Sequence, residues 1–479
     1  MASDETSQPL ELLLSVSRDG SRTLGAQIED HLRRTIRQGA LRPGARVPST
    51  RDLARQLGVS RRVVVDAYAQ LGAEGYLSLR QGARPRVAEA AAVASGARAE
   101  ASFPAAHARF DFRPSVPDVS TFPRAAWLRS LRTALATMTD ADLGYGDPRG
   151  VQVLRSALAD YLGRVRGVVA DPEQIVVTNG YTQGLAVVCH ALAAAGATRI
   201  ALEDPSNPED GLVAVHAGLQ PVLIGVDEAG TRVDELERAA ADAVVLTPAH
   251  QHPTGVVLTG ERRTALLAWL RASDAIAIED DYDAEYRYDR AAIGALQGLD
   301  PDRVIYVGSA SKTLAPALRI GWLVVPPWLL QAVSHEKLLA DRGTARIEQH
   351  AYADFLTRGE LDRHLRRMRT RYRSRRDALV DALAEALPEA AVLGVAAGLH
   401  VTVQLPDRDN EQAIREEAQE RRIEFETMSD YRPAAHERPP ALLLGYAQMP
   451  EPAIRAGVQE LAKAVRAARI RHLRSHELG

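Results

Sequence analysis

The sequence predicts an α/β protein in which a small, basic, helical module precedes a larger domain built on a mainly parallel sheet. Residues 19–88 contain thirteen arginines and six acids, a net charge of +7, whereas the rest of the chain carries −10 of the overall −3. A segment rich in alanine, serine and glycine follows the module. Beyond it, apolar runs of strand length alternate with helical stretches, a pattern typical of parallel sheets covered by helices.

Length and composition narrow the class of protein. A chain of 479 residues is too long for one core, so two or three domains are expected. The single cysteine, Cys189, excludes an internal disulfide framework and fits a reducing compartment. No apolar run reaches membrane-spanning length, and the first ten residues lack the pattern of a signal peptide. We therefore expect a cytoplasmic protein with no membrane partner.

Helical periodicity predicts three helices in the basic module. The apolar residues Ile28, Leu32 and Ile36 recur at helical spacing in the first of them. Gly58 separates two further helices, the second of which covers residues 61–73. A helix, a glycine turn and another helix at this spacing form a helix-turn-helix pattern.

Positive charge marks the expected DNA-contacting end of this module. Ser60 is a suitable N-cap for the last helix, and Arg61 and Arg62 follow it, so this end would enter the major groove. Residues 75–87 read as a two-stranded wing with a charged, glycine-containing tip. The alternative is a small helical domain with a solvated basic face. The position of the charge on the docking helix favours binding to double-stranded DNA.

The module resembles the winged-helix domain of GntR-type repressors. The resemblance rests on the motifs at residues 39–44 (GALRPG), 47–54 (VPSTRDLA) and 57–61 (LGVSR). Val65 stands where some relatives have a DNA-contacting arginine, so base preference does not carry over. The resemblance implies DNA contacts from Arg51, Ser60, Arg61 and Arg62, with Gln81 and Gly82 in the minor groove.

Three segments follow from these patterns. Residues 1–88 are expected to form the DNA-binding domain, residues 89–108 a flexible or partly helical linker, and residues 109–479 the large domain. Six strands are expected in the large domain, at residues 175–178, 198–202, 221–225, 243–246, 276–278 and 304–307. A further apolar run lies at residues 320–325. Ligands in such sheets bind at the carboxyl ends of the strands.

Lys312 is the strongest candidate for a reactive side chain. The chain has only three lysines, Lys312, Lys337 and Lys463, and uses arginine at its other basic positions. Arginine carries the charge equally well but cannot form an imine, so a lysine between a strand and a Pro/Gly-rich turn indicates an amine nucleophile. The alternative is an ordinary surface lysine. Imine chemistry with pyridoxal 5'-phosphate (PLP) also requires a carboxylate, a phosphate cradle and a phenol.

The sequence supplies these helpers at the ends of other strands. Asp280 follows an apolar strand and would pair with a pyridine nitrogen, and Tyr282 lies two residues further on. Residues 178–184 follow a strand and open a helix, a setting that suits a phosphate. Ser309 and Arg319 flank Lys312 and add two phosphate ligands. An acidic cluster after a strand can alternatively bind Mg²⁺, but the full set favours PLP and no metal.

Residues 109–479 resemble a fold-type I aminotransferase domain, and the whole chain resembles MocR/GabR-type transcriptional regulators. Supporting motifs lie at residues 145–150 (YGDPRG), 247–255 (TPAHQHPTG) and 364–369 (HLRRMR). The resemblance implies that Lys312 forms the Schiff base with PLP, Asp280 pairs with the pyridine nitrogen and Tyr282 binds the ring oxygen. It further implies a homodimer whose phosphate ligands are Tyr181, Thr182, Ser309 and Arg319, with Tyr145 from the neighbouring subunit.

Three departures from the aminotransferase pattern bear on activity. His252 replaces the usual asparagine at the cofactor, and Asn207 replaces an aromatic residue that stacks on the ring. The strand at residues 441–446 lacks the arginine that clamps a substrate carboxylate, and Arg438 lies outside it. A buried carboxylate without such a partner is costly, which argues against efficient amino-acid turnover.

The interpretation that follows is a PLP-dependent regulator that senses PLP and controls vitamin B6 genes, similar to PdxR-type proteins. The alternatives are a sensor of an amino acid or amine, an active aminotransferase with an appended DNA-binding module, and a helix-turn-helix protein that has lost PLP. The arginine-rich run at residues 363–376 suggests either a second DNA surface or the solvated face of one long helix. Apolar spacing, with Leu365, Met368 and Tyr372 facing inwards, favours the helix.

Overall fold

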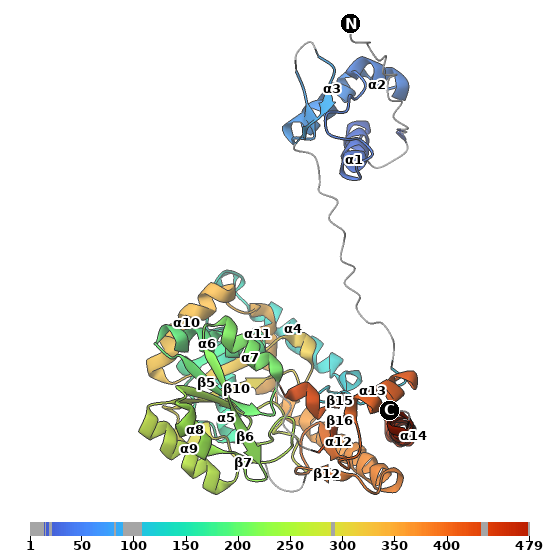
Figure 1. Cartoon of the computed structure of the whole chain (residues 1–479). Coiled ribbons are helices and arrows are strands. Elements are labelled where there is room, and N and C mark those ends of the chain that lie inside the picture. Colours follow the sequence, from blue (N-terminus) through green and yellow to red (C-terminus); the bar gives the residue numbers. More distant parts are fainter. Residues whose placement is uncertain are drawn as a thin grey trace. The chain divides into compact units, whose positions relative to one another are not determined.

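The computed structural model contains two compact units, residues 1–105 and residues 106–479, called here the N-terminal unit and the large unit. The structure describes residues 14, 16–18, 22–80, 83–89, 108–288, 293–432 and 439–477, with side chains to residue 471. Figure 1 shows the elements of both units.

The N-terminal unit is a winged helix-turn-helix. Its elements are α1 (Leu24–Arg37), α2 (Thr50–Leu57), α3 (Arg61–Ala73) and the antiparallel strands β1 (Leu77–Ser78) and β2 (Arg86–Val87). The three helices and the wing predicted from sequence are confirmed, and Ile28, Leu32 and Ile36 are buried as expected. Ser60 occupies the N-cap position of α3, but its hydroxyl makes no capping hydrogen bond, unlike that of Ser49 at α2. Ser60 is therefore the N-cap residue that the sequence predicted, although its side chain does not close the cap.

The large unit is organised around a mixed, mainly parallel sheet of eight strands in the order β4-β11-β10-β9-β8-β5-β6-β7. Strands β5, β6, β8, β9 and β10 run parallel, while β11 pairs antiparallel with both β10 and β4. The six predicted strands are all present, and the apolar run at 320–325 forms β11. The strands are β4 (Ile175–Thr178), β5 (Arg199–Asp204), β6 (Gln220–Asp227), β7 (Gly230–Thr231), β8 (Ala243–Leu246), β9 (Ile276–Asp280), β10 (Val304–Ser309) and β11 (Gly321–Val324).

Helices bury both faces of this sheet. Apolar side chains of α6, α7 and α10 pack on one face, and those of α8 and α9 pack on the other. Because both faces are covered, the central strands are continuous apolar runs rather than alternating ones. The helices of this region are α4 (Arg124–Thr137), α5 (Gln152–Arg166), α6 (Tyr181–Ala194), α7 (Pro208–His216), α8 (Val233–Ala239), α9 (Gly260–Ser273), α10 (Pro327–Asp341) and α11 (Arg346–Thr357).

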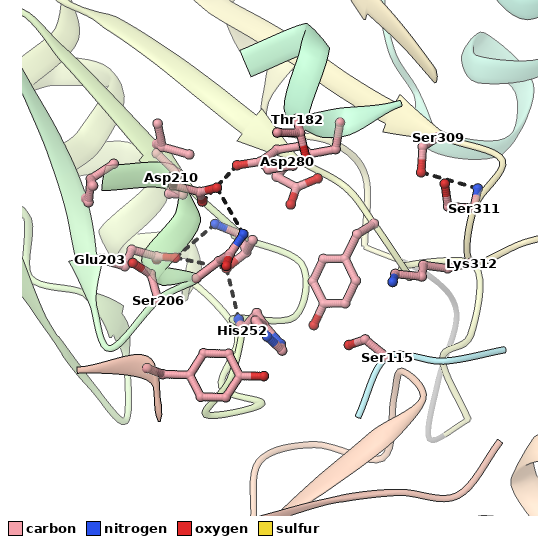
Figure 2. A pocket seen from close by; sticks show the side chains of 18 of the residues that line it. Ser115, Thr182, Glu203, Ser206, Asp210, His252, Asp280, Ser309, Ser311 and Lys312 are labelled. Atoms are coloured by element: carbon pink, nitrogen blue, oxygen red, sulfur yellow. Dashed lines mark hydrogen bonds between the residues drawn. The ribbon is translucent and has the colours of Figure 1, made fainter. Parts of the chain in front are cut away.

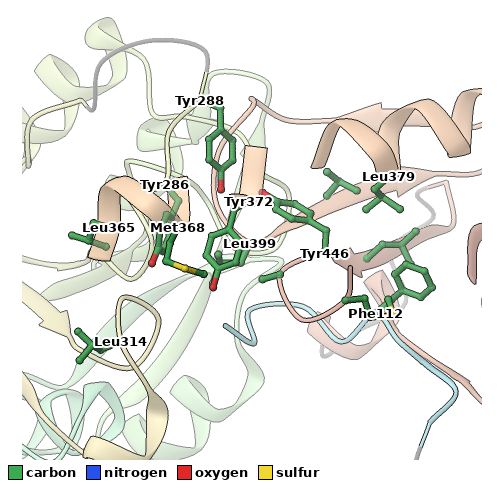
Figure 3. Close-up of a cluster of buried hydrophobic side chains, with 14 of the residues drawn as sticks. Phe112, Tyr286, Tyr288, Leu314, Leu365, Met368, Tyr372, Leu379, Leu399 and Tyr446 are labelled. Atoms are coloured by element: carbon green, nitrogen blue, oxygen red, sulfur yellow. The ribbon is translucent and has the colours of Figure 1, made fainter. Parts of the chain in front are cut away.

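The C-terminal part adds a second, smaller sheet, of order β12-β13-β16-β15, and long helices. A buried aromatic cluster joins it to the segment that follows β9 (Figure 3): the rings of Tyr286 and Tyr372 are 5.0 Å apart, and the Tyr446 hydroxyl donates to the Gly398 carbonyl at 2.5 Å. The cluster thereby fixes the chain just beyond Asp280. The remaining elements are α12 (Glu360–Ala386), β12 (Ala391–Leu393), β13 (His400–Gln404), α13 (Glu411–Glu420), β14 (Ile423–Glu424), β15 (Glu426–Thr427), β16 (Ala441–Gly445), α14 (Glu451–Glu477) and β3 (Phe110–Asp111), which pairs with β14.

The arginine-rich run forms one long helix, α12, as expected, but it is not simply a solvated face. Arg375 is buried and donates to Asp118 and to the carbonyl of Ala447. Arg369 and Arg373 donate to the backbone carbonyls of Glu285 and Tyr288. These arginines donate hydrogen bonds to backbone carbonyl groups that lie outside helices and strands. The periodicity of apolar residues in the sequence does not predict such contacts.

Candidate functional site

Nine of the ten side chains predicted to hold the cofactor line a single cavity of about 340 Å³ at the carboxyl end of the large sheet (Figure 2). A cavity of this size accommodates a small organic ligand. The nine are Tyr181, Thr182, Asn207, His252, Asp280, Tyr282, Ser309, Lys312 and Arg319. Only Tyr145 lies elsewhere.

Lys312 projects into the cavity from the turn after β10. Among the described residues its amine has no hydrogen-bonding partner, which is unusual for a lysine inside a protein. Burial lowers the pKa of Lys312, while the nearby carboxylates of Asp280 and Asp283 oppose that shift. Burial therefore favours the neutral amine, the form that attacks a carbonyl.

Asp280, the last residue of β9, presents a carboxylate to the same cavity. In the described part of the chain no donor pairs with it. Burial raises the pKa of Asp280 well above its usual range, and Asp210 raises it further. The side chain is half-buried and open to the cavity, where a protonated pyridine nitrogen would give its charge a partner. Asp280 therefore fits the ring of PLP.

The other acids of this cluster face away from the cavity, because successive residues near a strand end point to opposite sides. Asp281 forms a fully buried ion pair with Arg166, whose Nε lies 2.6 Å from the carboxylate. Glu279 accepts hydrogen bonds from the backbone amides of Leu296 and Gln297. Within the described ranges no group of three or more His, Cys, Asp or Glu side chains is arranged to hold a metal ion.

A concave backbone at the start of α6 fits the phosphate of PLP. Gly180 has a φ of +100°, and a Cβ added there would lie 3.0 Å from Nη2 of Arg319. Nη2 of Arg319 donates to the carbonyl of Asn179 at 2.5 Å, so the guanidinium is held against this turn. Thr182 and Ser309 also line the cavity. Amide groups at a helix N-terminus, two hydroxyls and a guanidinium suit a dianion.

A histidine that the sequence analysis did not select lies behind Tyr282. His250 Nδ1 is 3.1 Å from the Tyr282 hydroxyl and 3.1 Å from Oδ2 of Asp283. His250 thus lies between the phenol of Tyr282 and the carboxylate of Asp283, while Tyr282 itself lines the cavity. The motif TPAHQHPTG contains both histidines, but the sequence analysis selected only His252.

His252 lines the cavity with its Nδ1 buried and without a hydrogen-bonding partner among the described residues. Burial lowers the pKa of His252 to about 3, and Lys312 and His250 lower it further. The imidazole is therefore neutral and can donate or accept one hydrogen bond. Its ring lies 4.9 Å from that of Tyr431, a lining residue that was not predicted. A neutral imidazole can replace the amide of the usual asparagine at a ring oxygen.

Asn207 and Tyr181 are engaged within the protein. The Asn207 side chain caps α7 by accepting from the amide of Glu209, and it also donates to Asp210 at 3.1 Å. The Tyr181 hydroxyl donates to the same carboxylate at 2.9 Å, so Asp210 rather than a phosphate is its partner here. Asp210 lines the cavity and was missed, because an acid in the first turn of a helix is a common capping feature.

Asp210 makes the stability of the large unit depend on pH. Burial raises its pKa from 3.8 to about 7, so between these values the native state holds a proton that the unfolded chain has lost. The stabilisation is complete below 3.8 and is lost as the pH rises through 7. We expect Asp210→Asn to be more stable than the wild type by on the order of 1–4 kcal/mol at about pH 8, and by less at about pH 5. Urea unfolding at the two pH values measures the difference in the free energy of unfolding between the variant and the wild type. A difference that does not change with pH would contradict the raised pKa of Asp210.

Tyr145 lies in a separate groove beside residues 341–348. Its side chain is 91% exposed, and the Arg342 guanidinium is 5.9 Å from its ring. This exposure leaves Tyr145 accessible to a neighbouring subunit, as the predicted contact requires.

The predicted DNA contacts of the N-terminal unit lie on one exposed end of the helix-turn-helix. Arg51, Ser60, Arg61 and Arg62 are all exposed, at the starts of α2 and α3. Arg61 approaches the Thr50 hydroxyl at 3.5 Å, and Arg62 forms only a loose pair with Asp66 at 3.9 Å. These guanidinium groups are free to meet phosphates or bases. Gln81 and Gly82, predicted for the minor groove, lie outside the described residues.

The fold and site together define a class of protein, a winged helix-turn-helix joined to a PLP-enzyme-like domain. Residues 24–87 match the gntR family of bacterial regulatory proteins, and residues 117–427 match aminotransferase class I and II. The chain therefore belongs to the MocR/GabR-type transcriptional regulators, in which these two domains are combined.

Two relatives and one solved structure are similar to this chain over most of its length. The pyridoxine biosynthesis transcriptional regulator PdxR of Corynebacterium glutamicum is 34% identical over 72% of this chain and 76% of its own. The probable rhizopine catabolism regulatory protein MocR of Rhizobium meliloti is 34% identical over 74% and 76%. A multiple substrate aminotransferase from Thermococcus profundus superimposes with a TM-score of 0.69 at 25% identity, covering 76% of this chain and 92% of its own. None of the helices in the described part of the chain is both long and apolar enough to span a bilayer.

Proposed function

We propose that this regulator binds PLP in the cavity around Lys312, senses its concentration, and controls genes of vitamin B6 metabolism. The observation that carries the proposal is the pair of unsatisfied groups in one cavity, the Lys312 amine and the Asp280 carboxylate. Both are partly exposed to the cavity and meet no hydrogen-bonding partner among the described residues, and PLP offers a partner to each. The likeness to a regulator named for pyridoxine biosynthesis supports the choice of pathway.

When bound, PLP supplies an aldehyde that an amine captures reversibly and a phosphate that anchors it. Lys312 would hold it covalently, and Asp280 would keep the ring nitrogen protonated. Tyr282 and His252 would donate to the ring oxygen. The start of α6, with Thr182, Ser309 and Arg319, would hold the phosphate.

A sensor is favoured over an enzyme by the charges that line the cavity. Lys312 and Arg319 are the only cations among its described lining residues, and both are assigned to PLP. Strand β16 (Ala441–Gly445) contributes no arginine, and Arg438 lies outside the described residues. A substrate carboxylate would therefore lack a bidentate partner there and would meet Asp210 instead. Asn207, committed to capping α7, cannot stack on the ring.

Regulation further requires that PLP interact differently with two arrangements of the DNA-binding domains. We propose residues 1–88 as the DNA-binding domain, residues 89–108 as a tether, and residues 109–479 as the PLP-binding and dimerisation domain. Two copies would present two winged helices to an operator, and Tyr145 of each would reach the phosphate of the other. Each pair of half-sites would then follow the symmetry of the dimer.

A DNA-binding titration on the DNA upstream of this protein's own gene, with and without added PLP, tests the proposal. We expect PLP to change the apparent affinity by a factor of about 5 to 150, the usual range for coupled sites. Pyridoxal 5'-phosphate that has been reduced to its alcohol serves as the control, because it cannot be captured by Lys312. Equal affinity with and without PLP would rule out PLP sensing.

An aminotransferase with an appended DNA-binding module is the second candidate, favoured by the intact Lys312 and Asp280 and by the fold shared with aminotransferases. Single-turnover assays with a panel of amino acids separate the two. Rapid conversion of bound PLP to its amine form by one amino acid would favour the enzyme, or a sensor of that amino acid.

A further inference from the structure

A second lysine of this chain is fully buried outside the cavity. Lys337 lies on α10 with its side chain 0% exposed. Its Nζ donates to both carboxylate oxygens of Asp341, at 2.5 and 2.7 Å, and to the Thr344 hydroxyl at 3.1 Å. Burying an ammonium group is costly even when it is paired, and a pair of apolar side chains would often serve stability better. The segments that this pair holds in place therefore point to a role other than stability.

Asp341 connects the pair to the turn that begins α6. Its carboxylate accepts from Nδ2 of Asn179 at 2.8 Å and from Nε2 of Gln183 at 2.7 Å. Burial alone would raise the pKa of Asp341, but the hydrogen bonds from Lys337 and Gln183 outweigh burial and lower it. The carboxylate therefore remains ionised and holds both amide side chains.

The two amides lie on either side of the phosphate-binding turn. Gln183 Oε1 accepts from the backbone amide of Asn179 at 2.8 Å, which closes a ring of contacts around residues 179–183. The carbonyl of Asn179 in turn accepts from Nη2 of Arg319 at 2.5 Å. Rotation of this carbonyl or loss of the ring would move both the amide groups of the turn and the guanidinium that faces the phosphate.

The same pair fixes a second segment. Asp341 accepts from the amide of Gly343 at 2.8 Å, and the Thr344 hydroxyl reaches the carbonyl of Val177 at 3.3 Å. Residues 341–348 line the groove that contains Tyr145. One Lys–Asp pair is thus bonded to the turn behind the phosphate and to the segment beside Tyr145.

We propose that the Lys337–Asp341 pair is a positioning device for phosphate-bearing ligands: from outside the cavity it holds residues 179–183 so that the start of α6 and Arg319 converge on the phosphate. The inference rests on the proposed PLP site and assigns its phosphate recognition to a pair that does not touch the ligand. Its signature is selectivity for the phosphate. Affinity for PLP depends on the pair, and affinity for pyridoxal, which has the same aldehyde and ring but no phosphate, does not.

Equilibrium titrations of the full-length wild type and Lys337→Met with PLP and with pyridoxal test this, scored by the mass of the Lys312 adduct after borohydride reduction. Loss of an outer hydrogen-bonding partner weakens the binding of a metal by about 10- to 100-fold, and we expect a loss of PLP affinity on the same scale. Pyridoxal affinity should stay within about twofold, because pyridoxal has no phosphate for the turn to hold. A uniform loss for both ligands would show no selectivity for the phosphate. Lys463→Met, which removes an exposed lysine paired with Glu460, is the matched control and should bind both ligands as the wild type does.

Gln183→Leu provides a milder second variant that keeps the Lys337–Asp341 pair and removes its link to the turn. It should show the same selective loss, and it decides the matter if Lys337→Met does not fold. Equal losses for PLP and pyridoxal, or no loss for either, in a folded variant would overturn the inference while leaving the PLP site in place. A wild type that captures no PLP at all would remove the proposed function, and the inference with it.

Discussion

Lys312→Ala is expected to abolish covalent capture of PLP completely. The cavity offers no other amine among its described lining residues, and Arg319, its other cation, cannot form an imine. The wild type mixed with PLP and reduced with borohydride should gain the mass of one cofactor on Lys312, and its visible absorbance band should vanish on reduction. The variant should show neither change. Because alanine removes a lysine with no hydrogen-bonding partner in the described chain, the fold should be retained.

Lys463→Ala is the matched control for this experiment. Lys463 is exposed on α14 and pairs with Glu460 at 2.8 Å, so this variant makes the same substitution outside the cavity. That variant should take up PLP as the wild type does. If Lys312→Ala still forms a reducible adduct of the same stoichiometry, the assignment of Lys312 fails. If the wild type forms none, the large unit has lost PLP and serves another purpose, such as dimerisation.

Changing Arg61 and Arg62 together to alanine is expected to remove operator binding while leaving the capture of PLP intact. Both side chains are exposed at the start of α3, and neither makes a strong contact within the protein. Each contact of this kind contributes about 1–3 kcal/mol, so the pair should account for roughly a 30- to 20,000-fold loss. If both meet phosphates, the slope of log affinity against log salt should fall by about 1.8.

Arg34→Ala combined with Arg42→Ala provides a control with the same change in charge. Both arginines are exposed in the N-terminal unit but lie outside the starts of α2 and α3. This control should lower DNA affinity only slightly, through the long-range field. Fluorescence anisotropy at several salt concentrations measures all three proteins. Equal losses for the two double variants would mean that net charge, and not the recognition helix, holds the DNA. Loss of PLP capture in the first variant would contradict two separable modules.

The elements of both units were predictable because each has a local physical cause. Gly58 adopts the left-handed conformation that ends α2, and the spacing of Ile28, Leu32 and Ile36 fixes the buried side of α1. The central strands are apolar on both sides because helices cover both faces of their sheet. The strand ends were less predictable: β5 and β6 extend beyond the expected ranges into acidic residues whose pairing depends on neighbouring strands.

The candidate cofactor residues were predictable as a set because parallel strands deliver their carboxyl ends to one edge. Asp280 ends β9, Ser309 ends the neighbouring strand β10, and Lys312 lies in the turn after it, so that all three meet at one cavity. Their partners were not predictable. Whether Asn207 faces a ring or caps α7, and whether Tyr181 bonds a phosphate or Asp210, depends on contacts between segments that lie apart in the chain.

By itself, then, the sequence determined the order of elements, the two domains of the family and the choice of Lys312 as the candidate lysine, since periodicity, charge and residue chemistry are local properties. Only the tertiary structure decided which polar groups are satisfied. It placed His250 between Tyr282 and Asp283, left the Lys312 amine and the Asp280 carboxylate without partners among the described residues, and buried Lys337 in contact with Asp341, which holds the turn that begins α6. The physical reason is that burial makes the free energy of a polar group depend on its partners, and partners are brought together by the fold.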